Sequence, residues 1–204
     1  MATLKQDAPD VTGHGVLDAQ LPVYDVVLTE HLIVDAEPQS VFVAAKEFDF
    51  LTVRAPLVTT LMTLRGLPAR LRGRPDETPA ELRLAAEPGA LPGWLLLGEV
   101  AGREVAFGAV GKFWKADIEW RDVPVAEFAG FCEPGWGKIA CHLLVRPDGA
   151  GRSILTYECR TGTTDLDSRR EMSRYWWLIR PFVGYILRAV LRTIRADAET
   201  AARA

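Results

Sequence analysis

The sequence predicts an α+β fold in which a curved antiparallel sheet wraps around a long C-terminal helix, with two short helices after the first strand. Three observations support this fold. Residues 24–35 alternate between apolar and polar, residues 94–162 contain two hairpin patterns, and residues 166–198 carry a sustained helical stripe. The 204 residues suit one domain. We assign residues 1–22 to a flexible N-terminal arm and residues 23–199 to a single domain.

The first strand, residues 24–35, presents one apolar face that is interrupted only by Glu30. Pro38 then opens a helix, because its fixed φ angle suits a first helical turn. The buried stripe of this helix is formed by Val41, Phe42, Ala45 and Phe48. A second short helix is expected over residues 56–66, followed by an irregular segment over residues 72–92.

The first hairpin joins residues 94–100 to residues 103–113 around Ala101 and Gly102. In its second strand Phe107, Ala109 and Gly111 share one face with Val105 and Phe113. The small residues at 109 and 111 fit either close backbone packing or space for a ligand. A further strand over residues 116–123 and a helical turn near residues 125–129 follow.

The second hairpin joins residues 136–146 to residues 152–162 across a turn at Pro147-Asp148-Gly149. Placing Arg146 opposite Arg152 puts Cys141 and Cys159 on an apolar face as diagonal neighbours, together with Tyr157. The opposite face then carries His142, Glu158 and Arg160, which we interpret as a solvated charge network rather than a catalytic cluster.

The long helix is expected over residues 166–198, with Asp165 or Asp167 as its N-cap and a kink near Pro181. Its apolar stripe consists of Met172, Tyr175, Ile179, Val183, Ile186, Val190 and Ile194. A basic stripe of Arg188, Arg192 and Arg195 lies beside it, which is typical of a solvated outer face and also of helices that lie on anionic membranes.

This order of elements resembles the helix-grip fold of the SRPBCC superfamily, which includes START-like and birch-pollen-allergen-like proteins. The resemblance extends over residues 24–198, and residues 106–114, 127–138, 155–160 and 175–186 carry most of it. It implies a cavity between sheet and long helix for a hydrophobic ligand such as a lipid, sterol or polyketide, and it implies no catalytic motif. The pattern usually has Thr where this chain has Tyr157 and Cys159, so a smaller or differently shaped cavity is expected.

The candidate ligand contacts lie on the inner faces of the predicted strands and helix. They are Glu30, Phe107, Ala109, Gly111, Tyr157, Tyr175, Ile179 and Val183. Glu30 either points into the cavity, where burial raises the pKa of a carboxyl, or lies at a strand end or beside an arginine. The tyrosine hydroxyls are suited to orienting a ligand, because such cavities use few polar groups.

We expect a small-molecule carrier or sensor, with a cyclase-like enzyme using Glu30 and Tyr157, or a peripheral membrane protein, as alternatives. A formal net charge of −3 gives no expectation of nucleic-acid binding. No metal or cofactor motif is present, since the histidines and the three cysteines lack ligand spacing. The N-terminus has no signal-peptide pattern, so a cytoplasmic protein with reduced cysteines is expected.

Overall fold

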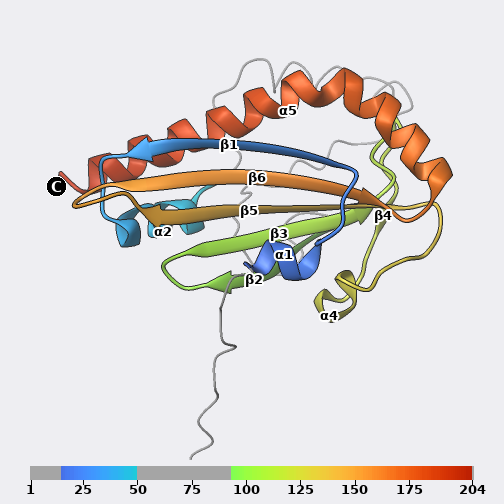
Figure 1. Ribbon diagram of the computed structural model, residues 1–204, viewed down its shortest axis with the longest axis horizontal. Coiled ribbons are helices and arrows are strands. Elements are labelled where there is room, and N and C mark those ends of the chain that lie inside the picture. Colours follow the sequence, from blue (N-terminus) through green and yellow to red (C-terminus); the bar gives the residue numbers. More distant parts are fainter. Residues whose placement is uncertain (1–14, 50–92, 204) are drawn as a thin grey trace, which may run out of the picture.

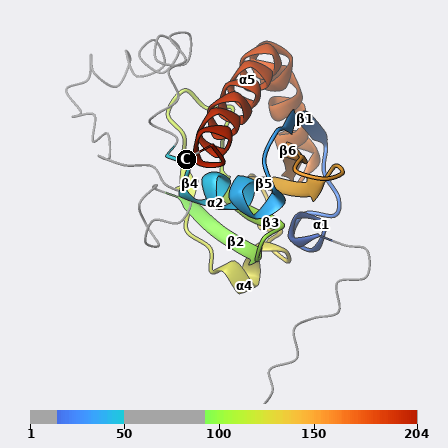
Figure 2. The same cartoon turned by 90° about the vertical axis from the view of Figure 1, so that its left-hand side faces the viewer.

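The computed structural model describes residues 15–49 and 93–203, which place helices on both faces of one antiparallel sheet (Figures 1 and 2). The strands are β1 (Val26–Val34), β2 (Trp94–Val100), β3 (Glu104–Gly111), β4 (Trp120–Arg121), β5 (Gly137–Pro147) and β6 (Ser153–Thr163). They follow the order β1-β6-β5-β3-β2, and β4 pairs with β3. The helices are α1 (Val16–Gln20), α2 (Pro38–Glu47), α4 (Val125–Phe128) and α5 (Leu166–Ala201). The predicted fold class is confirmed.

Strand β1 and helix α2 follow the predicted patterns. The even-numbered residues of β1 are the less accessible ones, and Val34 is fully buried. Pro38 is the first residue of α2, and its predicted stripe through Val41, Phe42 and Ala45 is buried together with Phe48. The second predicted helix, residues 56–66, and the predicted irregular segment, residues 72–92, lie outside the described residues.

The hairpin of β2 and β3 turns at Ala101 and Gly102 as predicted, with Gly102 at a φ of +74°. The expected strand over residues 116–123 is reduced to the two residues of β4. The segment before it is tied instead by side chains, because Lys112 and Lys115 both bind the carboxylate of Glu119. The helical turn expected near residues 125–129 is α4.

The pairing of β5 with β6 corrects the predicted register. Arg146 lies opposite Ile154 rather than Arg152, so the register is shifted by two residues. The cause is a tighter turn, in which the N–H of Asp148 donates to the carbonyl of Arg152 at 3.0 Å. An even shift keeps each side chain on its predicted face. It also brings Cys141 directly opposite Cys159 instead of diagonal to it.

Two hydrophobic clusters lie on opposite faces of the sheet. The larger cluster fills the concave face, where α2 and the second half of α5 pack over Leu143, Leu155 and Val105. The smaller cluster lies on the convex face, where Leu17 and Leu21 pack with Leu97, Phe128 and Ala140. The sequence predicted one apolar face, so the second cluster is a finding. Residues 16–21 of the predicted arm therefore pack against the sheet.

Helix α5 begins at the predicted cap and continues through Pro181. The Asp165 carboxylate accepts hydrogen bonds from the backbone N–H groups of Asp167 and Ser168, and also from Gly135 at 2.5 Å. These bonds lower the pKa of Asp165 from 3.8 to about 2, with the bond from Ser168 contributing most. The helix is not interrupted at Pro181, but it changes direction in its first half (Figure 1).

The Asp165 cap gives a first prediction. Replacing Asp165→Ala removes the acceptor for the first turn of α5, and the melting temperature should fall by roughly 2 to 4 °C. The matched control Asp167→Ala, two residues on, should change it far less, because Asp167 is exposed and pairs only with Arg170. Since folding lowers the pKa of Asp165, its stabilisation is complete above pH 3.8 and is lost as the pH falls through about 2. Equal melting curves for the two variants at pH 6 would contradict this role.

Candidate functional site

The concave face of the sheet has two ends that differ in packing. At one end Val34, Leu143 and Leu155 are fully buried under α2 and the second half of α5. At the other end, under the first half of α5, Leu28 and Ile139 are only half-buried although they point to the same side. These side chains pack at the margin of the larger cluster, and they stay partly accessible in the part of the chain that the structure describes.

We call this region the open end, and define it by Leu28, Trp94, Ile139 and Cys159 on the sheet, all half-buried. The stripe of α5 that faces it is half-buried as well. Three predicted ligand residues belong to that stripe, namely Tyr175, Ile179 and Val183. The open end is therefore bounded by apolar side chains on both the sheet and the helix.

A groove of about 660 Å³ separates β1 from the first half of α5 beside the open end. Leu28 and Glu30 line it from the strand, and Trp176, Pro181 and Gly184 line it from the helix. Gly184 is where α5 lies against β1, since a Cβ atom there would be in ordinary contact with the Cδ2 atom of Leu28 at 3.4 Å. Leu28 is the residue that the groove shares with the open end.

Glu30 lies in this groove and is paired. Its Oε1 atom accepts a hydrogen bond from Arg188 of α5 at 2.5 Å, and both side chains reach solvent. The ion pair joins β1 to α5 at the surface of the groove. Of the possibilities that the sequence left open for Glu30, the structure therefore has the one in which the carboxylate lies beside an arginine. Glu30 thus borders the groove as one half of an ion pair.

Three aromatic side chains form a row across the concave face. The ring centroids of Trp94 and Phe107 are 5.7 Å apart, and those of Phe107 and Tyr157 are 6.1 Å apart. Phe107 and Tyr157 are each 5% exposed, so the row runs from the filled core to the half-buried Trp94. Burial raises the pKa of Tyr157 well above its ordinary value, and the thiols of Cys141 and Cys159 raise it further. The Tyr157 hydroxyl is therefore protonated at neutral pH, and its hydrogen bond to the Cys141 thiol raises its pKa as well.

The two small residues of β3 have different surroundings. Ala109 is fully buried and pairs with Trp94 on one side and Ile139 on the other, so it adjoins the open end. Gly111 is at the end of the strand, where an added Cβ atom would lie 3.0 Å from the Phe113 ring and 3.1 Å from the carbonyl oxygen of Glu119. Close packing thus accounts for Gly111. Ala109, in contrast, contributes only a small side chain next to the open end.

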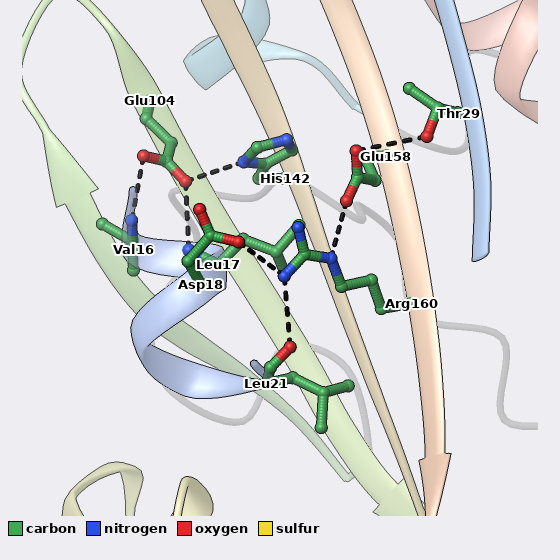
Figure 3. Close-up of polar contacts among 9 residues, drawn as sticks. All are labelled: Val16, Leu17, Asp18, Leu21, Thr29, Glu104, His142, Glu158 and Arg160. Atoms are coloured by element: carbon green, nitrogen blue, oxygen red, sulfur yellow. Dashed lines mark hydrogen bonds and ion pairs between the residues drawn. The ribbon is translucent and has the colours of Figure 1, made fainter. Parts of the chain in front are cut away.

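The convex face carries a polar network that the sequence predicted only in part (Figure 3). Arg160 binds Glu158 at 2.6 Å, Asp18 at 2.7 Å and the carbonyl oxygen of Leu21 at 3.2 Å. Thr29 of β1 donates to Glu158 at 3.1 Å. The network thus joins β1 and β6 to α1, and it lies on the side of the sheet opposite the open end.

Glu104 is the member of this network that sequence reasoning missed. Its side chain is 1% exposed and accepts hydrogen bonds from the backbone N–H groups of Val16 and Leu17 at 3.0 and 3.1 Å. His142 Nδ1 lies 2.7 Å from the same carboxylate. Burial, the largest single influence, raises the pKa of Glu104, but the bonds from His142, Leu17 and Val16 together outweigh it and the pKa is lowered. Glu104 therefore acts as a buried anionic cap for α1.

Within the described residues, no group of three His, Cys, Asp or Glu side chains is arranged to hold a metal ion. Among the same residues, no helix is long and apolar enough to cross a bilayer. His142 and Glu104 are thus a buried pair that anchors α1, and the chemistry available at the open end comes from tyrosine hydroxyls and thiols.

Comparison with known proteins gives low similarities. No family model matches the chain, and no curated protein matches it. Among solved structures, TTHA0849 from Thermus thermophilus aligns with a TM-score of 0.32 and 10% identity, covering 86% of this chain and 99% of that one. CalU16 from Micromonospora echinospora aligns with a TM-score of 0.28 and 13% identity, covering 87% and 85%. Similarities this low carry no argument, and the helix-grip arrangement stands on this chain's own sheet order and long helix.

The Glu104 cap gives a second prediction. Replacing Glu104→Ala leaves the α1 N–H groups and buried His142 without their acceptor, and should lower the free energy of unfolding by about 3 kcal/mol. Urea unfolding measures this loss, and hydrogen exchange should show faster exchange in residues 15–21. The control Glu99→Ala removes only an exposed ion pair with Lys46 and should cost about 0.5 kcal/mol. Unchanged exchange in residues 15–21 of the Glu104 variant would disprove the anchoring role.

Proposed function

We propose that the protein binds a small hydrophobic molecule at the open end of the concave face, between the sheet and the first half of α5. The observation that supports this most is that inward-pointing Leu28, Ile139 and Cys159 are half-buried although an apolar helix stripe faces them. A ligand at this position would complete the burial of side chains that the described residues leave partly accessible.

The chemistry of the open end suits a mostly apolar ligand with one polar group. Burial of apolar surface stabilises such a complex by about 25 cal/mol for each Å² removed from water. The Tyr157 hydroxyl is buried and bonded to Cys141, so the polar group that this surface offers is the half-buried thiol of Cys159. The groove beside Gly184 is the route by which a ligand would enter.

The same residues favour a carrier or sensor over the cyclase-like alternative. Glu30, the best acid-base candidate in the sequence, is engaged by Arg188 at the groove surface. The raised pKa of Tyr157 suits hydrogen-bond donation and opposes its use as a general base near neutral pH. Enclosure of a ligand without chemical conversion is therefore the function that we propose.

Binding can be tested by filling the open end. Ile179→Trp on the inner stripe of α5 should weaken binding of the best ligand from a panel of fatty acids, sterols and aromatic polyketides by about tenfold or more, because the indole occupies the ligand's space. The matched control Leu178→Trp adds the same ring at the next residue, which is 62% exposed, and should leave binding unchanged. Isothermal titration calorimetry measures the affinity, because the introduced indole would add its emission to that of the six native tryptophans.

A panel in which no compound changes the fluorescence or melting temperature of the wild-type protein would contradict the proposal. Equal affinities for the two tryptophan variants would contradict the location. Circular dichroism of both variants checks that each retains the fold.

A second candidate function, docking on an anionic membrane, is favoured by the outer face of α5. Trp177 is 83% exposed and Leu178 is 62% exposed. From Met172 to Ala196 the helix has five arginines and no Asp or Glu, although the whole chain has a net charge of −3. Exposed apolar residues amid basic ones are typical of helices that lie in a membrane surface. This surface would place the groove next to the lipids from which a hydrophobic ligand is drawn.

Vesicle sedimentation tests this candidate. The wild-type protein should pellet with vesicles of phosphatidylcholine and phosphatidylglycerol and not with phosphatidylcholine alone, since the arginines need an anionic surface. Trp177→Ala with Leu178→Ala should reduce the bound fraction several-fold. The control pair Val27→Ala with Ile33→Ala, exposed on β1, should not. Equal binding to both vesicle types would contradict electrostatic docking.

A further inference from the structure

Two thiols face each other across the central strands of the sheet. Cys141 of β5 and Cys159 of β6 are directly opposite residues in the ladder, and both point to the concave face. Cys141 is buried, whereas Cys159 is half-buried and belongs to the open end. Both thiols are free in this structure. Only the observed register places them directly opposite each other, since the register predicted from the sequence made them diagonal neighbours.

The hydrogen-bond pattern shows which kind of pair they form. The N–H of Asp148 donates to the carbonyl of Arg152, and the N–H of Thr164 donates to the carbonyl of Trp136, so even-numbered residues of β5 bond to β6. The N–H of Val145 donates instead to the carbonyl of Arg103, so odd-numbered residues of β5 bond toward β3. Cys141 is odd-numbered. It therefore forms a non-hydrogen-bonded pair with Cys159.

This kind of pair is the one that brings side chains closest. Opposed residues at non-hydrogen-bonded positions have Cα atoms about 4.5 Å apart, which lies within the range of about 4.4 to 6.8 Å found for disulfides. Their Cβ atoms are typically about 4.5 Å or slightly more apart, against about 3.5 to 4.5 Å in a disulfide. Small local adjustments of the two strands are therefore sufficient to join the sulfur atoms.

We infer that Cys141 and Cys159 form a reversible cross-strand disulfide when the protein reacts with a hydroperoxide. Cys159 is the thiol that is oxidised first, and Cys141 is the resolving thiol. In the first step the Cys159 sulfur takes one oxygen from the hydroperoxide, which leaves as an alcohol, or as water when the oxidant is hydrogen peroxide. In the second step the Cys141 sulfur attacks the sulfenic acid, the S–S bond forms and water departs. Two thiols are oxidised and one peroxide bond is reduced, so atoms and electrons balance.

The surroundings assign the order of the two steps. Cys159 is the more accessible thiol, so a small oxidant reaches it first. Burial raises the pKa of Cys141 well above its ordinary value, which weakens it as a nucleophile and leaves the first oxidation to Cys159. The second step is intramolecular, so a weaker nucleophile is sufficient for it. The fixed place of Cys141 opposite Cys159 then gives it a high effective concentration for the second step. The disulfide also changes the immediate neighbours of the Tyr157 hydroxyl, but its formation does not require the ligand proposed above.

Peptide mapping of a Cys132→Ser protein tests the inference, since Cys132 is exposed and would form bonds between molecules. Trypsin cuts after Lys138, Arg152 and Arg160, which separates Cys141 in residues 139–152 from Cys159 in residues 153–160. After treatment with hydrogen peroxide under native conditions, the two peptides should appear as one linked species that a thiol reductant separates. Both free thiols should disappear together.

Two further variants in the same background assign the roles. With Cys141→Ser, a dimedone adduct should accumulate at Cys159, because no resolving thiol is present. With Cys159→Ser, Cys141 should keep its free thiol. Circular dichroism confirms the fold of each variant. The inference is overturned if the Cys132→Ser protein keeps two free thiols under conditions that fully oxidise Cys132 in the wild type. It is equally overturned if Cys159 is oxidised without becoming linked to Cys141.

Discussion

The alternation of side chains along the paired strands β5 and β6 is the constraint on which the two faces of this molecule depend. Each strand is eleven residues long, and their ladder keeps successive residues on opposite sides. Cys141 therefore points to the concave face, and its neighbour His142 points to the convex face. A slip of one residue would exchange the apolar concave face with the network that holds α1, so the long ladder fixes both at once.

The sequence predicted these faces correctly even though its register was wrong by two residues. Side-chain direction depends on whether a shift is odd or even, and an apolar pattern reports only that property. The distance between Cys141 and Cys159 depends on the full register, which the turn at Asp148 to Arg152 sets through one hydrogen bond and two glycines at positive φ. Turn residues predicted a hairpin here, but several closing pairs were compatible with them.

Other features were missed because their signals lie far apart in the chain. Glu104 and His142 are 38 residues apart, and nothing in either local pattern links them. Leu17 and Leu21 are two apolar residues in a segment rich in glycine and polar groups, too few to indicate a docked helix by periodicity. Their burial follows from the small side chains of Ala106 and Ala140 on the convex face, which leave room for α1. The apolar stripe of α5 likewise did not predict how deeply each residue is buried, because among the described helices α2 packs against the second half of α5.

Pro181 and Gly184 lie where the tightly packed half of α5 meets its loosely packed half. Proline has no N–H to donate to the carbonyl of Trp177, so the helix is locally less constrained on the groove side. One turn later, Gly184 lies against Leu28 of β1, where even an alanine Cβ would make an ordinary contact. The missing hydrogen bond of α5 is thus next to the point where the helix meets the strand. A bend there would change the width of the groove between β1 and the helix and would leave the packed second half of α5 in place.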